Sequence, residues 1–155
     1  MKPSVYIETT IPSYLVARPS RDIVLAGHQQ ATRDFWSHRR HEFDLFISSY
    51  VLDESRSGEA EMAERRLQSM QGIPLLLETS ESSALALRLV ARLGLPQRAE
   101  ADAYHIAIAA VNEMDFLLTW NCTHINNLHM LRRIEETCRD AGFVPPVIGT
   151  PEELV

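Results

Sequence analysis

The chain has 155 residues, of which 45% are hydrophobic and 23% are charged, and its formal net charge is −6. This composition predicts a single globular domain over residues 1–155 with a substantial core, and the absence of a signal-peptide pattern or a membrane-length apolar run predicts a cytoplasmic protein without membrane contact. The acidic balance disfavours a protein that holds nucleic acid through phosphate contacts alone, but it is compatible with an enzyme whose acidic residues bind cations.

Five short apolar segments predict the strands of the domain. They lie at residues 4–8, 43–48, 75–77, 116–120 and 146–148. Val5-Tyr6-Ile7 and Phe116-Leu117-Leu118 are apolar on both faces, which is typical of strands that are buried in a parallel sheet. Leu75-Leu76-Leu77 is expected to be buried as well, whereas Pro146 indicates an edge strand.

Helical patterns fill the segments between these strands. Helices are expected to start at Thr10 and to cover residues 20–40, 49–54, 59–70, 79–94, 98–112 and 128–141. The fifth of these helices carries Ala84, Leu87 and Ala91 on one side at helical spacing. Gly94 is expected to end that helix. The alternation of strands and helices predicts a three-layer α/β/α domain with a mostly parallel sheet of four to five strands.

Polar residues follow the predicted strands where each strand ends. Glu8 follows the first strand, Glu54 lies just past the second, and Asn121 follows the fourth, while Asp102 lies at the start of a helix. In a parallel sheet these positions meet at one edge, which is where ligands bind in open α/β folds. Carboxylates that converge without matching cations repel one another unless a cation is bound. Oxygen ligands without thiolates indicate Mg²⁺ or Mn²⁺, which activates water and stabilises phosphoryl charge.

Each of these residues also has a purely structural interpretation. An acid such as Glu8 caps the helix after it, and Asn121 is of a type that forms turns after strands. His105 follows Asp102 by three residues, a spacing at which both side chains reach one metal, yet an unpaired histidine in a helix is more often a structural residue. His124 is a further candidate for contact with a substrate.

The chain resembles PIN-domain proteins of the VapC-like toxin group, and the resemblance covers nearly its whole length. The matching pieces are Tyr6-Ile7-Glu8-Thr9-Thr10, Ser49-Tyr50-Val51-Leu52-Asp53-Glu54, Ala101-Asp102-Ala103-Tyr104-His105-Ile106-Ala107, Leu118-Thr119-Trp120-Asn121 and Gly149-Thr150-Pro151-Glu152-Glu153-Leu154. The resemblance implies a single PIN-like domain with strand order 3-2-1-4-5. It also implies a Mg²⁺- or Mn²⁺-dependent ribonuclease that acts on RNA and is blocked by a cognate antitoxin protein.

The resemblance assigns catalytic and metal-binding roles to four positions. Glu8 matches the first acid of the family, Glu54 the second, Asp102 the third and Asn121 the fourth position. The family more often has aspartate at the first and fourth positions, so one tightly held ion is expected here, with a second arriving with substrate. Glu8, Asp102 and Asn121 are then expected to hold the ion, while Glu54 completes the site and orients or deprotonates the attacking water.

Three further residues are candidates for substrate binding. Thr10 matches the polar residue two positions after the first acid, and Arg56 and Arg98 flank the acids in sequence, where they either steady phosphates or only add solubility. The alternative function is a catalytically silent PIN-fold module that binds RNA or a partner protein. A phosphatase-like enzyme with an aspartyl nucleophile is disfavoured because Glu8 stands where that nucleophile is needed. The sequence leaves open the RNA target, the antitoxin and whether the chain forms a homodimer.

Overall fold

The structure is a computed structural model, and it describes residues 1–154. Its strands are β1 (Ser4–Ile7), β2 (Asp44–Ser48), β3 (Leu75–Leu76), β4 (Phe116–Leu118) and β5 (Val147–Gly149). Its α-helices are α1 (Thr10–Val16), α2 (Ile23–Asp34), α3 (Ser49–Ser55), α4 (Ala60–Ser69), α5 (Ser80–Leu93), α6 (Glu100–Val111) and α7 (Leu128–Asp140). A π-helical turn at Phe35–Arg39 extends α2, and short 3₁₀ turns cover Arg40–Glu42 and Gln97–Ala99.

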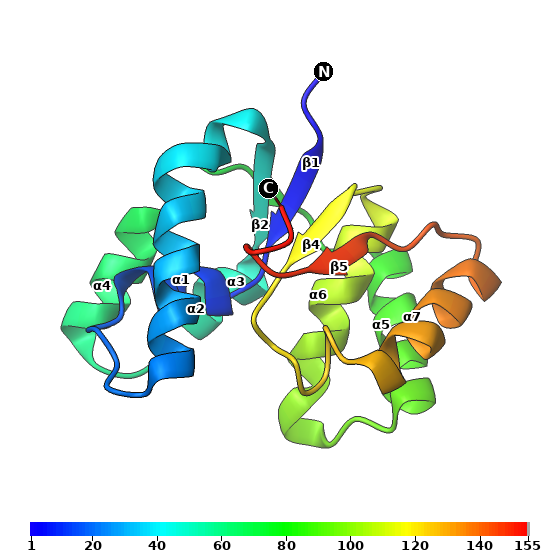
Figure 1. Cartoon of the computed structure of the whole chain (residues 1–155). Helices are drawn as coiled ribbons and strands as arrows, with labels where there is room; N and C mark the ends of the chain where they lie inside the picture. Colours follow the sequence, from blue (N-terminus) through cyan, green and yellow to red (C-terminus); the bar gives the residue numbers. More distant parts are fainter. Residues whose placement is uncertain (155) are drawn as a thin grey trace.

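The five strands form one parallel sheet in the order β3-β2-β1-β4-β5, which confirms the predicted topology (Figure 1). β1 is central, since Val5 pairs with Leu45 of β2 on one side and with Phe116 of β4 on the other. The chain builds β2 and β3 on one side of β1 and then crosses over to add β4 and β5 on the other side. The segments that follow β1 and β4 therefore separate at the topological switch point, which is the usual place for a ligand site.

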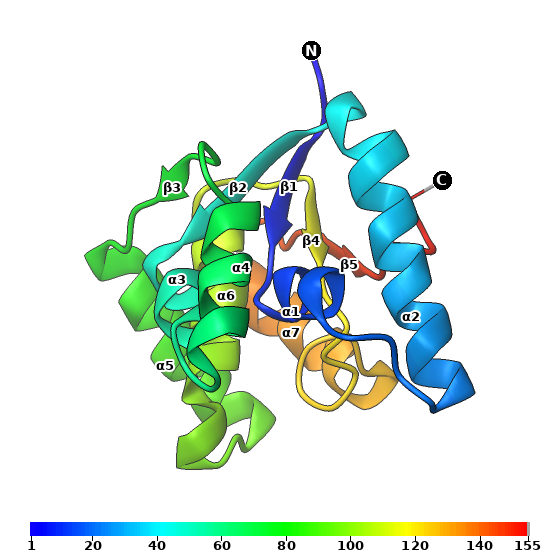
Figure 2. The same cartoon turned by 90° about the vertical axis from the view of Figure 1, so that its left-hand side faces the viewer.

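Helices cover both faces of the sheet, as expected for three layers. Figure 1 shows α5, α6 and α7 grouped on one side of the strands and α1, α2 and α4 on the other, and the helix contacts agree with this grouping. Figure 2, turned by 90°, shows β1 running down into α1 with β2 and β4 beside it. Within residues 1–154, no helix is both long enough and apolar enough to cross a lipid bilayer.

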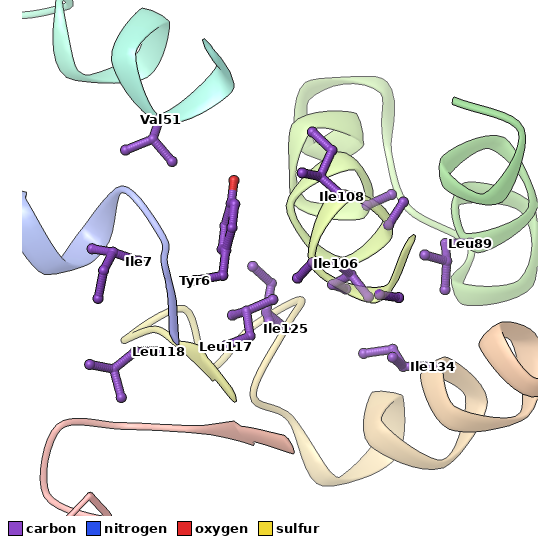
Figure 3. Close-up of a cluster of buried hydrophobic side chains, with 14 of the residues drawn as sticks. Tyr6, Ile7, Val51, Leu89, Ile106, Ile108, Leu117, Leu118, Ile125 and Ile134 are labelled. Atoms are coloured by element: carbon purple, nitrogen blue, oxygen red, sulfur yellow. The ribbon is translucent and has the colours of Figure 1, made fainter. Parts of the chain in front are cut away.

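The core lies between the central strands and α6. Tyr6, Ile106 and Leu117 are fully buried, and Figure 3 shows them on the side of the strands that faces α6. The buried Ile7 and Leu118 lie on the other side of the strands in the same figure. These residues are apolar on both strand faces because both faces are covered by helices. The alanines of α6 add no bulk, so this helix lies close against the sheet.

The predicted burial of the third strand is wrong. Leu75 and Leu77 are 50% and 74% exposed, because β3 is a two-residue strand at the edge of the sheet and has helix cover on little of its surface. On α5, Ala84, Leu87 and Ala91 do share one side, but it is the exposed side, and Leu87 is 61% exposed. Leu85 and Leu89 face the core, because α5 carries apolar residues on several sides and packing selects among them.

Gly94 and Gly27 provide a matched test of how backbone conformation affects the stability cost of adding a side chain. Gly94 ends α5 in the left-handed conformation with φ of 64°, whereas Gly27 lies within α2, and an added Cβ would meet open space at either position. We expect Gly94→Ala to lower the free energy of unfolding by about 1 kcal/mol, because only its backbone conformation disfavours a side chain. Gly27→Ala should raise the same free energy by about 0.5–1 kcal/mol. Urea denaturation of both variants measures this, and a loss of stability in both would contradict it.

Candidate functional site

The candidate site lies at the carboxyl edge of the central strands. Glu8 comes directly after β1, Glu54 is on α3 after β2, and Asp102 is in the first turn of α6. Thr119 and Asn121 follow β4, which is paired with β1. Side chains that follow three strands, and one from the start of a helix, therefore lie at the same edge of the sheet. The polar residues after the predicted strands had indicated this edge.

Glu8 is a buried carboxylate held by hydroxyl groups from both neighbouring strand ends. Glu8 as a whole residue is only 3% exposed. Its Oε1 accepts from the hydroxyls of Thr10 and Thr119, each at 2.5 Å, and its Oε2 accepts the backbone N–H of Thr10 at 3.2 Å. Burial raises the pKa of the Glu8 carboxyl, although the positive charge of His105 and these hydrogen bonds act in the opposite direction.

Glu54 is paired with a buried histidine. Its Oε1 accepts from the hydroxyl of Thr9 at 2.7 Å and lies 2.5 Å from Nε2 of His105. The Glu54 side chain is 37% exposed, whereas that of His105 is fully buried. Burial acts to raise the pKa of Glu54, but the hydrogen bond and charge of His105 outweigh it, so that pKa is lowered. Burial acts to lower the pKa of His105, but the bond to Glu54 and the charge of Glu8 outweigh it, so that pKa is raised.

The imidazole of His105 is held from its other side by the core. Its Nδ1 lies 2.6 Å from the hydroxyl of Tyr6, which in turn lies 2.7 Å from Oγ of Ser48. Tyr6 and Ser48 are both fully buried. In Figure 3 the ring of Tyr6 stands away from β1 with its hydroxyl directed towards α3.

Asp102 and Asn121 lie at the same edge with other partners. Oδ2 of Asp102 accepts from Nδ1 of His124 at 2.9 Å, and the two side chains are 13% and 21% exposed. Oδ1 of Asn121 accepts the backbone N–H groups of Thr123 and His124, at 3.2 and 3.0 Å. The amide oxygen of Asn121 therefore shapes the turn after β4, and that turn presents His124 to Asp102.

The three residues predicted to bind substrate are placed differently from one another. The Thr10 hydroxyl donates to Glu8 and accepts the backbone N–H of Trp120 at 2.7 Å, so it joins the ends of β1 and β4. Arg56 forms an exposed ion pair with Asp53 at 2.7 Å. Arg98 is exposed in the turn before α6.

Three side chains at this edge form a possible metal-binding group. Ligand atoms of Glu8, Glu54 and His105 all lie within 4.8 Å of one another. The donor chemistry fits a divalent cation, because two of the three are carboxylates and each uses one oxygen for most of its protein hydrogen bonds. Within residues 1–154, no hydrogen bond occupies Oε2 of Glu54 or Oδ1 of Asp102.

Aromatic contacts hold the segment that follows β4. The indole of Trp120 stacks on the ring of His28, with centroids 4.1 Å apart, and on the ring of Tyr14 at 5.9 Å. Its Nε1 donates to the hydroxyl of Thr32 at 2.7 Å. These contacts fix the start of the loop that carries Asn121.

A cavity of about 450 Å³ lies at the opposite end of the sheet, near Asp115 and Val147. We place the site at the acids beside Glu8 because Asp115, one of the two acidic residues that line this cavity, already accepts from the backbone and hydroxyl of Ser4.

Sequence reasoning missed three members of this site. It treated His105 as more often structural, and it gave no role to Thr119 or Tyr6. A signal for Thr119 was present, since a hydroxyl at the carboxyl end of a buried strand beside β1 faces the same edge as Glu8. The contact between Tyr6 and His105 joins residues 99 positions apart and has no local signature.

The His105–Glu54 pair predicts a pH dependence of stability in the metal-free protein. Because the pKa of His105 is raised on folding, the folded chain holds its proton more tightly than the unfolded chain. This contribution is fully present below the ordinary imidazole pKa of about 6.5, and it is lost as pH rises through the raised value. Denaturation in EDTA should therefore show wild type losing its stability advantage over His105→Gln as pH rises. A difference that stays constant with pH would contradict this.

Comparisons with known proteins address the fold. No protein-family model matches the sequence, and no curated protein matches it. Among solved structures, the chain is similar to a chain of VapBC2 from Rickettsia felis bound to a DNA fragment from the promoter. The TM-score is 0.60 at 16% identity, covering 95% of this chain and 98% of that chain. The chain thus has a PIN/VapC-like fold, as its sequence resemblance predicted.

Proposed function

We propose that this chain is a metal-dependent ribonuclease, formed by a single PIN-like domain, and that it is the toxin of a toxin–antitoxin pair. The observation that carries the proposal is the convergence of the Glu8 and Glu54 carboxylates, whose ligand oxygens lie within 4.8 Å of each other at the switch point of a PIN/VapC-like sheet. Asp102 adds a third carboxylate at the same edge.

The proposed ligands of Mg²⁺ or Mn²⁺ are the carboxylates of Glu8, Glu54 and Asp102. When bound, the ion supplies positive charge at the phosphate of an RNA substrate and lowers the pKa of a water molecule. Glu8 is held rigidly by Thr10 and Thr119, so its position is set before a ligand arrives. Asn121, expected as the fourth ligand, supports this proposal through the turn that it holds.

Glu54 is the proposed residue that orients and deprotonates the attacking water. One of its oxygens is held by Thr9 and His105, while the side chain remains 37% exposed, so it is both fixed and accessible. Its lowered pKa keeps it ionised near neutral pH, which a proton acceptor requires. Arg56 and Arg98 are exposed at neighbouring positions and are proposed only as outer contacts for phosphates.

An antitoxin is the proposed protein partner. The similar solved structure is described as VapBC2 bound to a promoter DNA fragment, and by analogy a partner protein would cover the acid edge of this chain. The net charge of −6 supports a partner with basic residues for this edge.

The test is cleavage of RNA by the purified chain with Mn²⁺, with Mg²⁺ and with EDTA. Glu8→Gln, purified in parallel, controls for nucleases carried over from the host. Cleavage that needs the metal and is lost in the variant supports the proposal. Calorimetry with Mn²⁺ is the second arm, and a chain that neither binds millimolar Mn²⁺ nor cleaves RNA would instead be the silent binding module.

A further inference from the structure

We propose that His105 is a positioning residue for Glu54, donating from Nε2 to the carboxylate while Tyr6 and Ser48 fix the imidazole from the core. This deepens the proposed function, because it names the residues that set the geometry of the proposed proton acceptor. Its first test below does not need nuclease activity.

The hydrogen-bonded side chains of Ser48, Tyr6 and His105, called the relay below, come from three elements of the fold. Ser48 ends β2, Tyr6 lies in β1 and His105 lies on α6, and all three residues are fully buried. Successive atoms are 2.7 Å apart between Ser48 and Tyr6 and 2.6 Å apart between Tyr6 and Nδ1 of His105. Nε2 then contacts Glu54. The partly exposed Glu54 is therefore connected through His105 to hydrogen-bonded side chains in the buried core.

Elementary hydrogen-bond chemistry gives this relay a direction. An ionised carboxylate only accepts, so Nε2 must carry a proton. In a neutral ring Nδ1 is then an acceptor, Tyr6 donates its single proton to it, and the oxygen of Tyr6 accepts from Ser48. In the protonated ring Nδ1 donates to Tyr6 and Tyr6 donates to Ser48, while Nε2 donates to Glu54 in both forms. The other imidazole tautomer would point a lone pair of Nε2 at the Glu54 carboxylate.

The relay ends inside the protein, which favours positioning over proton transfer to solvent. Ser48 is fully buried, and within residues 1–154 its hydroxyl has no side-chain partner besides Tyr6. The same geometry disfavours His105 as a metal ligand, because Nε2 already contacts Glu54. Tyr6 lies on β1, which leads directly into Glu8, so the same strand positions Glu8 in the chain and supports Glu54 through His105.

The first test is ¹⁵N NMR of histidine-labelled protein without metal, followed to alkaline pH until the His105 signals stop changing, so that its neutral imidazole is observed. The signals of His105 are identified as those that are present in the wild-type spectrum and absent from the spectrum of His105→Gln. We expect Nε2 to be protonated and Nδ1 to be unprotonated, with Tyr6→Phe shifting Nδ1 and the matched control Tyr104→Phe leaving it unchanged. The Nδ1-protonated tautomer, or no effect of Tyr6→Phe, would overturn the proposal. A change in the ¹⁵N chemical shift of Nε2 that is typical of a metal ligand, seen on adding Zn²⁺, would also overturn the proposal.

The second test compares His105→Gln with His105→Asn. The glutamine amide reaches the place of Nε2 and can still donate to Glu54, whereas the asparagine amide reaches only the place of Nδ1. Losing such a supporting contact typically lowers activity about 10- to 100-fold. We expect that loss in kcat for His105→Asn, with KM for RNA little changed, and recovery to within about threefold of wild type for His105→Gln.

The outcomes separate this proposal from the proposed function. A wild-type chain that does not cleave RNA contradicts the ribonuclease, and the NMR arm then decides the positioning role alone. Equal activity of the two variants overturns the positioning role while leaving the ribonuclease intact. Should His105→Asn fail to fold in thermal melts, Tyr6→Phe takes its place in the activity assay and is expected to lose kcat in the same direction.

Discussion

Glu8→Gln should reduce metal-dependent RNA cleavage by about 100-fold or more and, at the same time, stabilise the metal-free protein at neutral pH. The loss follows from removing the buried carboxylate that is fixed by Thr10 and Thr119 at the centre of the proposed site. The gain follows from the raised pKa of Glu8, which shows that burial disfavours its charged form.

The sign of the stability effect can be tested with pH. The folded chain binds the Glu8 proton more tightly than the unfolded chain, so this group makes the free energy of unfolding fall as pH rises from its ordinary to its raised pKa. A glutamine carries no such penalty, so the advantage of the variant should grow over that range and persist above it. Urea denaturation in EDTA measures it, with the exposed Glu64→Gln as control. A variant that is active, or is less stable at neutral pH than at acid pH relative to wild type, would contradict this.

Asp102→Asn should lower Mn²⁺-dependent cleavage by about 100-fold and weaken Mn²⁺ binding in calorimetry. The substitution keeps the shape of the side chain and leaves an oxygen for the contact with His124, but it removes the negative charge of a proposed ligand. The fold should survive because Asp102 is at the first turn of α6, outside the apolar core.

The matched control is Asp140→Asn, an exposed aspartate at the end of α7 that lies 3.7 Å from Arg92. It should cleave RNA and bind Mn²⁺ as wild type does. If Asp102→Asn binds Mn²⁺ and cleaves RNA normally, Asp102 is not a ligand and its contact with His124 is structural.

Much of the fold was predictable because its signals are local. Strands such as Val5-Tyr6-Ile7 are short, apolar on both faces and bounded by polar residues, and each was found within one or two residues of its predicted range. The convergence of Glu8 and Glu54 followed from the same reasoning, since parallel strands bring their carboxyl ends to one edge. The strand order itself came from the family resemblance and agrees with the structure.

The remaining features depend on packing that no local pattern encodes. The rotation of α5, which exposes Leu87, is decided by which side of the helix fits α6 and α7. The partners of the histidines are also long-range: His105 meets Glu54 across 51 positions, and His124 meets Asp102 across 22. The spacing of three between Asp102 and His105 suggested a shared metal, but the structure gives each a different partner.

The donors around the acids also bear on how the chain reaches its mature state. Hydroxyl groups hold Glu8 and a histidine holds Glu54, so the protein itself satisfies these carboxylates in part. Small metal domains whose ligands have no such donors fold only when the metal binds. In this chain the protein's own donors already hold Glu8 and Glu54, so the proposed cation is not needed to assemble the acid edge. Under the proposed function, folding and metal uptake would then be separable events, and loading would depend on the free cation concentration rather than on further folding.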